Sequence, residues 1–189
     1  MNTHPLSCAA LALTLAALPA QAQTYDLLAT VSGTAIVTEV LDANGPVLRF
    51  VTQATGNGSI TGLQLLITGY TSTDVVNMGT GSGSGTNVFI ADNGDQLFGS
   101  FTVQATPTAT PGALTLQGLT TFSGGTGLFS GASGSAAFTG NGSFISPTQA
   151  LVSFVHSGSV AVVPEPATGA LIAGGLAVIA AVARRRRAL

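Results

Sequence analysis

The residue best suited to proton transfer is His156, since the other histidine of the chain lies in its first few residues. His156 shares its alternation parity with Val152, Phe154, Val160 and Val162, so we expect it to point inward from a strand. A general base also needs a partner acid and a reachable substrate, and no spacing in the sequence identifies either. We therefore expect a hydrogen-bonded core histidine and predict that the protein is not an enzyme.

A second group that could do chemistry is the acidic turn formed by Asp92, Asn93 and Asp95. Carboxylate and amide oxygens are the ligands that Ca²⁺ prefers, but a calcium site takes six to eight oxygens and few other carboxylates are available. The same three residues are also those that a tight hairpin turn needs. The glycine-rich segment 79–85 has no following lysine and is predicted to be a flexible loop, not a phosphate cradle. We predict no metal and no cofactor.

The composition excludes several further classes of site. Of the 189 residues only 6% are charged, no lysine occurs, and the single cysteine, Cys8, lies near the start. Downstream of it there is no thiol for a disulfide, a metal or a nucleophile. The basic residues are Arg49 and a terminal cluster, and the acids lie in the body, which argues against a nucleic-acid partner. Glu39 is expected to pair with Arg49 across the first hairpin.

The segment 23–161 must position these side chains, and its pattern is that of strands. Short β-type runs alternate with Gly, Ser and Thr, and in one run Leu97 and Phe101 share a parity opposite to Phe98. Asn-Gly between apolar runs predicts hairpins at Leu41–Pro46 and Ala91–Gln96. The prolines of 106–111 must leave the sheet or form an edge. We predict an all-β fold, an antiparallel β-barrel with a β-sandwich as the alternative; the candidate strands are 27–41, 46–54, 59–69, 86–91, 96–105, 113–122, 134–140 and 150–163.

Two local sequence features bear on the type of sheet. The string TGNGSI at 55–60 recurs as TGNGSF at 139–144, which suggests two equivalent tight corners. The glycine-bounded segment 122–140 resembles a hairpin of dirigent-like and allene-oxide-cyclase-like β-barrels. This resemblance favours a barrel over a sandwich.

The N-terminal segment 1–22 has the organisation of a signal peptide. Its apolar core, Leu6–Leu18, is too short to cross a bilayer comfortably. Small residues at Ala20 and Ala22 predict cleavage by signal peptidase before Gln23. The alternative is a buried helix of the mature domain.

The C-terminal segment 162–189 contains an uncharged apolar run, 167–183, that ends in four arginines. As a helix this run reaches roughly 26 Å, close to the thickness of the hydrocarbon core. Basic residues favour the cytoplasmic side, so we predict a transmembrane helix with the body on the opposite side. A permanent single-pass anchor is the alternative to a temporary one.

The string VPEPAT at 163–168, followed by this apolar run and the four arginines, resembles the PEP-CTERM sorting signal of Gram-negative bacteria. The resemblance implies recognition by a membrane-embedded exosortase, cleavage near the Pro-Glu-Pro, and release or transfer of the body to the outside. It also implies association with exopolysaccharide or biofilm. The residues that carry it are the motif Val163, Pro164, Glu165, Pro166, Ala167 and Thr168, and the topology anchor Arg184, Arg185, Arg186 and Arg187.

We therefore expect a non-enzymatic protein that is anchored transiently in the inner membrane and ends secreted, at the cell surface or in the extracellular matrix. The alternative is a secreted ligand- or carbohydrate-binding β-barrel. Expected partners are signal peptidase, exosortase, extracellular polysaccharide and further copies of the chain. An open lumen with polar or aromatic walls would favour the ligand-binding alternative, whereas a filled lumen would favour the first hypothesis.

Overall fold

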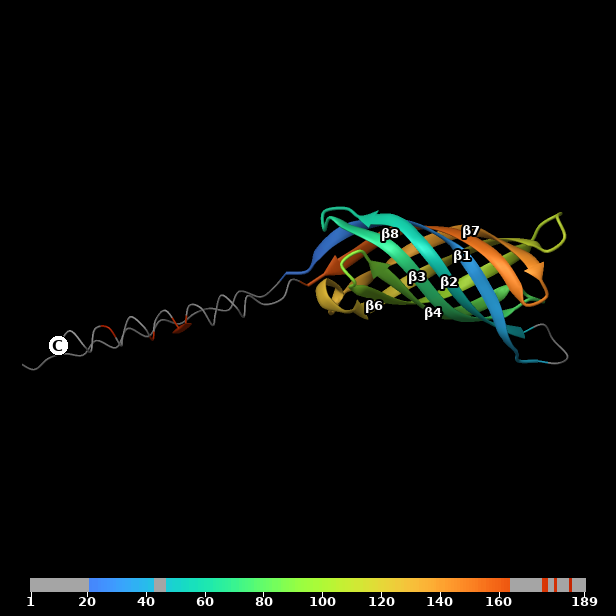
Figure 1. Cartoon of the computed structure of the whole chain (residues 1–189), viewed down its shortest axis with the longest axis horizontal. Helices are drawn as coiled ribbons and strands as arrows, with labels where there is room; N and C mark the ends of the chain where they lie inside the picture. Colours follow the sequence, from blue (N-terminus) through green and yellow to red (C-terminus); the bar gives the residue numbers. More distant parts are fainter. Residues whose placement is uncertain (1–20, 43–46, 164–174, 177–178, 180–183, 185–189) are drawn as a thin grey trace, which may run out of the picture.

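The computed structural model describes residues 21–42, 47–163, 175–176, 179 and 184. Eight antiparallel strands close into a barrel, with each strand hydrogen-bonded to the next in the sequence (Figure 1). One 3-10 turn, η1, lies between β6 and β7. The elements are β1 (Gln23–Val40), β2 (Val47–Ile60), β3 (Leu65–Asn77), β4 (Ser82–Ala91), β5 (Gln96–Pro107), β6 (Ala113–Gly125), η1 (Gly127–Phe129), β7 (Ser133–Ser146) and β8 (Gln149–Val162).

The pairing of the first strand with the last distinguishes a barrel from a sandwich. β8 pairs with β1 over the whole length of β8, from Val162 opposite Gln23 to Gln149 opposite Ile36. This seam leaves no free edge among the described strands, since closure pairs every strand on both sides. The prediction of an all-β antiparallel barrel is confirmed, and the sandwich alternative is wrong.

Alternation along each strand decides which residues fill the barrel. In β5, Leu97 and Phe101 are buried in the lumen, whereas Phe98 points outward and is 36% exposed. Successive side chains of a strand point to opposite faces, and only one face of a closed sheet can avoid water. The parity predicted for this strand is therefore confirmed.

The predicted hairpins join strands as expected. At Ala91–Gln96 the chain reverses through Gly94, whose φ of +88° suits a residue without a side chain. The first predicted hairpin joins β1 to β2, where the Leu41 N–H donates to the Val47 carbonyl at 2.8 Å; residues 43–46 lie outside the described part of the chain. Thr106 and Pro107 still pair with β6, and the chain leaves the sheet only after Pro107, so the prediction for 106–111 is confirmed for its later part alone.

Three local predictions are wrong. The candidate strand 59–69 contains a turn, because Gly62 and Gln64 adopt positive φ and separate β2 from β3. Segment 79–85 is only partly a loop, since β4 begins at Ser82 and residues 83–85 pair on both sides. The repeated strings 55–60 and 139–144 are not corners between strands; they lie within β2 and β7, and the first carries a register shift between Thr55 and Gly58.

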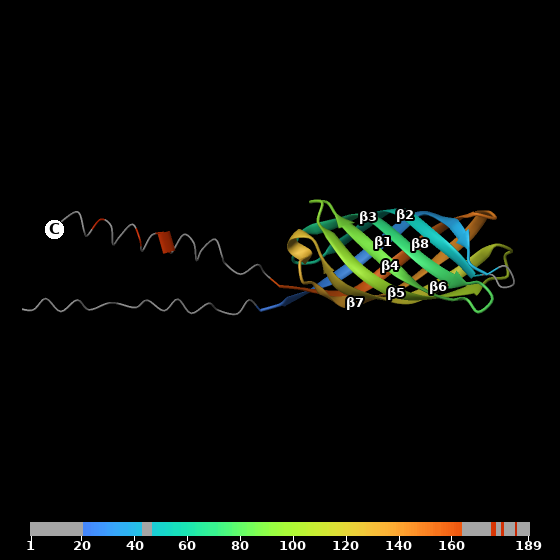
Figure 2. The same ribbon diagram turned by 90° about the horizontal axis from the view of Figure 1, so that it is seen from below.

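The interior divides into two clusters along the barrel axis. One lies at the end where β1 begins and β8 finishes, and we call it the packed half; it contains Leu27, Ile67, Phe89, Leu97, Phe122, Phe129 and Val160 among others. The other lies toward the turns that follow β1, β3, β5 and β7, and we call it the open half; its buried members are Ala35, Phe50, Val76, Ala105, Ala150 and Val152. Both ends of the described barrel leave from the packed half (Figure 2).

Candidate ligand-binding site

The packed half is closed by large side chains and by η1. Phe89, Leu97 and Phe129 are completely buried, and Phe129 is contributed by η1 itself. The Leu128 N–H donates to Asp95 Oδ2 at 3.0 Å, which ties η1 to the turn between β4 and β5. Large buried side chains therefore occupy the lumen at this end.

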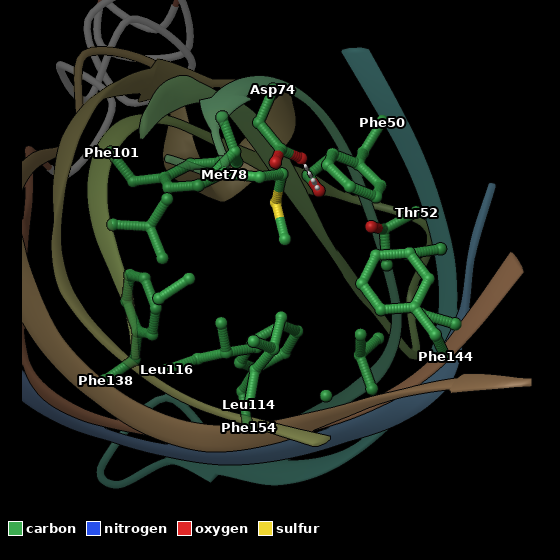
Figure 3. Close-up of a pocket in the computed structure, with 18 of the residues that line it drawn as sticks. Phe50, Thr52, Asp74, Met78, Phe101, Leu114, Leu116, Phe138, Phe144 and Phe154 are labelled. Atoms are coloured by element: carbon green, nitrogen blue, oxygen red, sulfur yellow. Dashed lines mark hydrogen bonds between the residues drawn. The ribbon is translucent and has the colours of Figure 1, made fainter. Parts of the chain in front are cut away.

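The open half holds a cavity with about 650 Å³ of space free of atoms, part of which belongs to its open mouth. Figure 3 shows the labelled side chains arranged in a ring around the hollow, with the sulfur of Met78 projecting into it. The wall is largely apolar and rich in phenylalanine. Its lining includes Phe50, Tyr70, Met78, Phe101, Val103, Leu114, Leu116, Phe138, Phe144, Val152 and Phe154.

Small residues at inward positions help to keep this half open. Ala35, Ala105 and Ala150 line the cavity, as does Gly142 of β7. A Cβ atom added to Gly142 would meet its nearest neighbour, Leu116, at 3.4 Å, which is ordinary contact. The space beside Gly142 is thus lumen, not a close approach of two strands.

A polar strip interrupts the apolar wall on β2 and β3. Thr52, Tyr70, Ser72 and Asp74 all line the cavity. The Ser72 hydroxyl donates to Asp74 Oδ1 at 3.4 Å, which is long for a hydrogen bond. Burial raises the pKa of Asp74 from 3.8 to about 6, and the Ser72 hydrogen bond only partly opposes that rise.

The polar strip continues toward the packed half through Tyr70 and Asn87. Asn87 is 2% exposed and its Nδ2 donates to the Thr120 hydroxyl at 3.1 Å. Burial raises the pKa of Tyr70 to about 12, and the nearby polar side chains of Asn87 and Ser72 only partly oppose that rise. The phenol is therefore a neutral hydrogen-bonding group at neutral pH.

His156 lies inside the barrel, as its parity predicted, but its environment differs from the expected one. It is 1% exposed and its ring packs against four aromatic rings, with the centroid of Phe89 at 5.0 Å and 90°. Among the described residues its buried Nδ1 has no hydrogen-bond partner, so the expectation of a hydrogen-bonded histidine is wrong at this nitrogen. Burial lowers the pKa of His156 to about 4, and the ring is neutral at neutral pH.

The acidic turn serves the backbone. Asp92 Oδ1 accepts the Leu66 N–H at 3.2 Å, and Asn93 Nδ2 donates to Asp95 Oδ2 at 2.8 Å. Within the part of the chain that the structure describes, no three acidic, histidine or cysteine side chains gather as a metal site would require. The predicted hairpin turn thus accounts for the geometry of these residues.

The predicted pair Glu39 and Arg49 is confirmed. The two residues lie opposite each other on β1 and β2, and Arg49 Nε donates to Glu39 Oε2 at 3.0 Å. Both side chains are exposed, so the pair belongs to the outer surface.

Most of the predicted export and sorting residues lie outside the described residues: 1–20, which include Ala20, then Pro164, Glu165, Pro166, Ala167 and Thr168, and Arg185, Arg186 and Arg187. Ala22 and Gln23, on either side of the predicted cut, are exposed, as is Val163. Within the predicted transmembrane run, Gly175, Leu176 and Ile179 are helical and exposed, and so is Arg184 after it. Among the described residues, none belongs to a helix with the length and apolar character needed to cross a membrane.

Sequence reasoning missed the part of the polar strip that lies on β3, because it assigned no strand to residues 70–77. A signal was present: Tyr70, Ser72, Asp74 and Val76 share one parity, while Thr71, Thr73 and Val75 share the other. The inward set is as polar as the outward set, so alternation of hydrophobicity did not mark a strand there.

Comparison with known proteins identifies the C-terminal segment. A family model described as the PEP-CTERM protein-sorting motif matches residues 162–187, a range that includes the motif and the arginines predicted from the sequence. No curated protein and no solved structure shows significant similarity to the chain. The motif marks an exported, cell-surface or secreted protein that is targeted to exosortase.

Proposed function

We propose that this chain is anchored transiently in the inner membrane, is cut by exosortase, and then works without catalysis in the extracellular polysaccharide of a biofilm. The PEP-CTERM motif is the observation that carries this proposal. It begins at Val162, the last residue of β8, so the sorting segment follows the barrel without an intervening domain.

The arrangement of the chain ends is consistent with such a tether. Gln23 and Val162 are partners in the closing seam of the barrel. Val163 follows β8 at the packed half (Figure 2), so a membrane segment attached there would leave from that end. The residues that line the cavity belong to the open half. The tethered protein would hold its open half away from the membrane.

The outer surface supports association with a polysaccharide. A shallow hollow across β6, β7 and β8 is lined by hydroxyl and amide groups of Thr115, Gln117, Thr139, Asn141 and Ser153. Neutral groups of this kind donate and accept hydrogen bonds without requiring a charged partner. A glycan offers the same groups in return.

Intact-mass measurement on protein from the native cell surface, with and without the exosortase, tests the sorting step. We expect a species that starts at Gln23 and lacks Arg187 in the parent strain, and a retained C-terminus in the deletion strain. Recovery of the same full-length species from both strains would contradict the proposal. Any sugar added to the body would appear in the same spectrum.

Cosedimentation with the exopolysaccharide of the same cells tests the matrix role. The double variant Gln117→Ala/Asn141→Ala removes two amides from the hollow, and Ser84→Ala/Thr86→Ala on outward positions of β4 is its matched control. We expect the first variant to lose several-fold more retention than the second. Equal retention of both variants and the parent would argue against this surface.

A second candidate function is ligand binding, and the open half of the lumen favours it. The cavity has the mostly apolar lining of small-molecule sites, with a few convergent polar groups. We expect the neutral fluorophore N-phenyl-1-naphthylamine to brighten on binding there. Gly142→Leu should fill the cavity and abolish the signal, whereas Ser143→Leu on the outward face of β7 should not; equal signals would refute binding in the lumen.

A further inference from the structure

We propose that the open half of the lumen binds an elongated aliphatic amine, with the ammonium group beside Asp74 and the apolar chain along the phenylalanine-rich wall. This inference rests on the proposed ligand-binding role and specifies the chemistry of the ligand. Three observations support it: the charge of the cavity, the lack of a counter-ion among the described residues, and the position of Asp74 along the barrel.

Asp74 is the charged residue in the lining of an otherwise neutral cavity. A carboxylate in apolar surroundings is costly unless it is paired and hydrogen-bonded. Its one side-chain hydrogen bond, from Ser72 at 3.4 Å, is well beyond the length of a charge-assisted bond. A carboxylate offers about four lone-pair sites, so most of its accepting capacity is left for a group in the cavity.

The described chain supplies no cation that fits this role. Its positively charged side chains are Arg49 and Arg184, since the sequence has no lysine. Arg49 is held on the outer surface by Glu39, and Arg184 follows the barrel in the sorting segment. His156, the remaining basic side chain, is neutral at neutral pH. A cationic ligand would supply the counter-ion that the described chain does not provide to Asp74.

The position of Asp74 orients the ligand. Asp74 lies on β3 between Tyr70 and Asn77, the last residue of the strand at the open end. Phe138, Phe154 and Tyr70 line the cavity near His156, where the packed half begins. An amine beside Asp74 is thus near the mouth, and an attached chain extends toward these rings (Figure 3).

The same features disfavour other ligand classes. A fatty-acid anion would be repelled by the carboxylate. A sugar would need several polar partners, whereas the wall opposite the polar strip is formed by leucine, valine and phenylalanine side chains. A neutral alcohol can donate one hydrogen bond to Asp74 but gains no ionic attraction.

Displacement of N-phenyl-1-naphthylamine from the exported protein by three ten-carbon ligands tests the proposal at pH 8, where Asp74, with its pKa of about 6, is ionised. We expect decylamine to compete at a concentration about tenfold lower than decanol does. The difference between decylamine and decanoate should be larger still. Asp74→Asn should bring the three ligands to within about threefold of one another. The matched control Asp26→Asn removes a carboxylate from the outer surface of β1 and should preserve the preference.

Equal competition by the three ligands on the parent protein overturns the amine proposal, and this comparison needs no variant that could fail to fold. A preference that survives Asp74→Asn overturns the role of that residue. Failure of the fluorophore to bind the parent protein overturns the ligand-binding role itself.

Discussion

The same eight strands build a packed half and an open half within one barrel. In the packed half Phe89 and Phe129 are fully buried, and η1 covers the end. In the open half alanines and Gly142 stand at inward positions and no comparable turn enters the lumen among the described residues. Strand pairing alone therefore fixes the barrel, and the sizes of inward side chains decide whether its lumen is filled.

The packed half and the open half also contribute differently to stability and to binding. Packed apolar side chains contribute to stability through burial and close contact. A wall that borders an empty cavity makes contacts on one side only, so its side chains contribute less to folding. We expect substitutions in the packed half to change stability most and substitutions in the open half to change binding most.

The largest expected effect is the loss of a ring from the packed half. Phe89→Ala removes a fully buried ring that packs against Tyr70, Phe122 and His156, and should lower the free energy of unfolding by about 3–5 kcal/mol. Phe144→Ala in the open half removes a half-buried ring beside the cavity and should cost about 1–2 kcal/mol. Urea unfolding of both variants measures the difference, and equal losses would show that the halves are equally packed.

The sequence alone predicted much of the fold and little of the cavity. Asn-Gly turns and the alternation around Leu97 and Phe101 are short-range signals, and they predicted strands and a hairpin correctly. Closure between β1 and β8 joins residues from opposite ends of the body, and the sequence indicated it only through the general pattern of short strands. The cavity depends on which inward residues face one another across the lumen, and that information is not local.

His156 and Asp74 illustrate the same limit. Parity placed His156 inside correctly, but its neighbours Tyr70, Phe89 and Phe138 come from three other strands and could not be inferred from spacing. The sequence pattern did not mark Asp74 as a site residue, because a single aspartate between threonine and valine is usually a surface residue. Its burial follows from the barrel as a whole.

The next effect concerns these two groups, which should respond to acid in opposite directions. The unfolded chain protonates His156 near pH 6.5 and the folded barrel only near pH 4, so acidification across that window lowers the free energy of unfolding. Asp74 is protonated near pH 6 in the folded barrel and near pH 3.8 in the unfolded chain, so acidification across that window raises the free energy of unfolding. Tyr70, the titratable neighbour of both, stays protonated throughout.

Two variants separate the opposing contributions, each worth about 3 kcal/mol at about 1.4 kcal/mol per pKa unit. In Asp74→Asn only the contribution of His156 remains, so the free energy of unfolding should fall as the pH is lowered from 6.5 to 4. In His156→Phe only the contribution of Asp74 remains, so the free energy of unfolding should rise as the pH is lowered from 6 to 4. The parent protein should change less than either variant, and identical pH profiles of all three in urea unfolding would disprove the assignment.

A smaller effect is expected from the hydrogen bond between Asp95 and η1 at the packed end. Asp95→Ala removes the acceptor of the Leu128 N–H and of the Asn93 amide, and should lower the free energy of unfolding by about 1–2 kcal/mol. Hydrogen exchange should show faster opening around η1, while the turns at the open end stay unchanged. Asp95→Asn, which keeps an oxygen acceptor, is the matched control and should lose less; equal exchange in both variants would mean that the tie does not hold η1.

The smallest expected effect lies at the open end, on the outer surface. Glu39→Gln removes the charge that pairs with Arg49, but both side chains are exposed and water screens the pair. We expect the free energy of unfolding to fall by at most about 0.5 kcal/mol at low salt, and the difference to vanish near 1 M salt. Thermal unfolding at two salt concentrations measures it, with Gln53→Glu on the same strand as Arg49 as a control for added charge. A loss as large as that of Asp95→Ala would show that surface charge, and not the size of inward side chains, stabilises the open half.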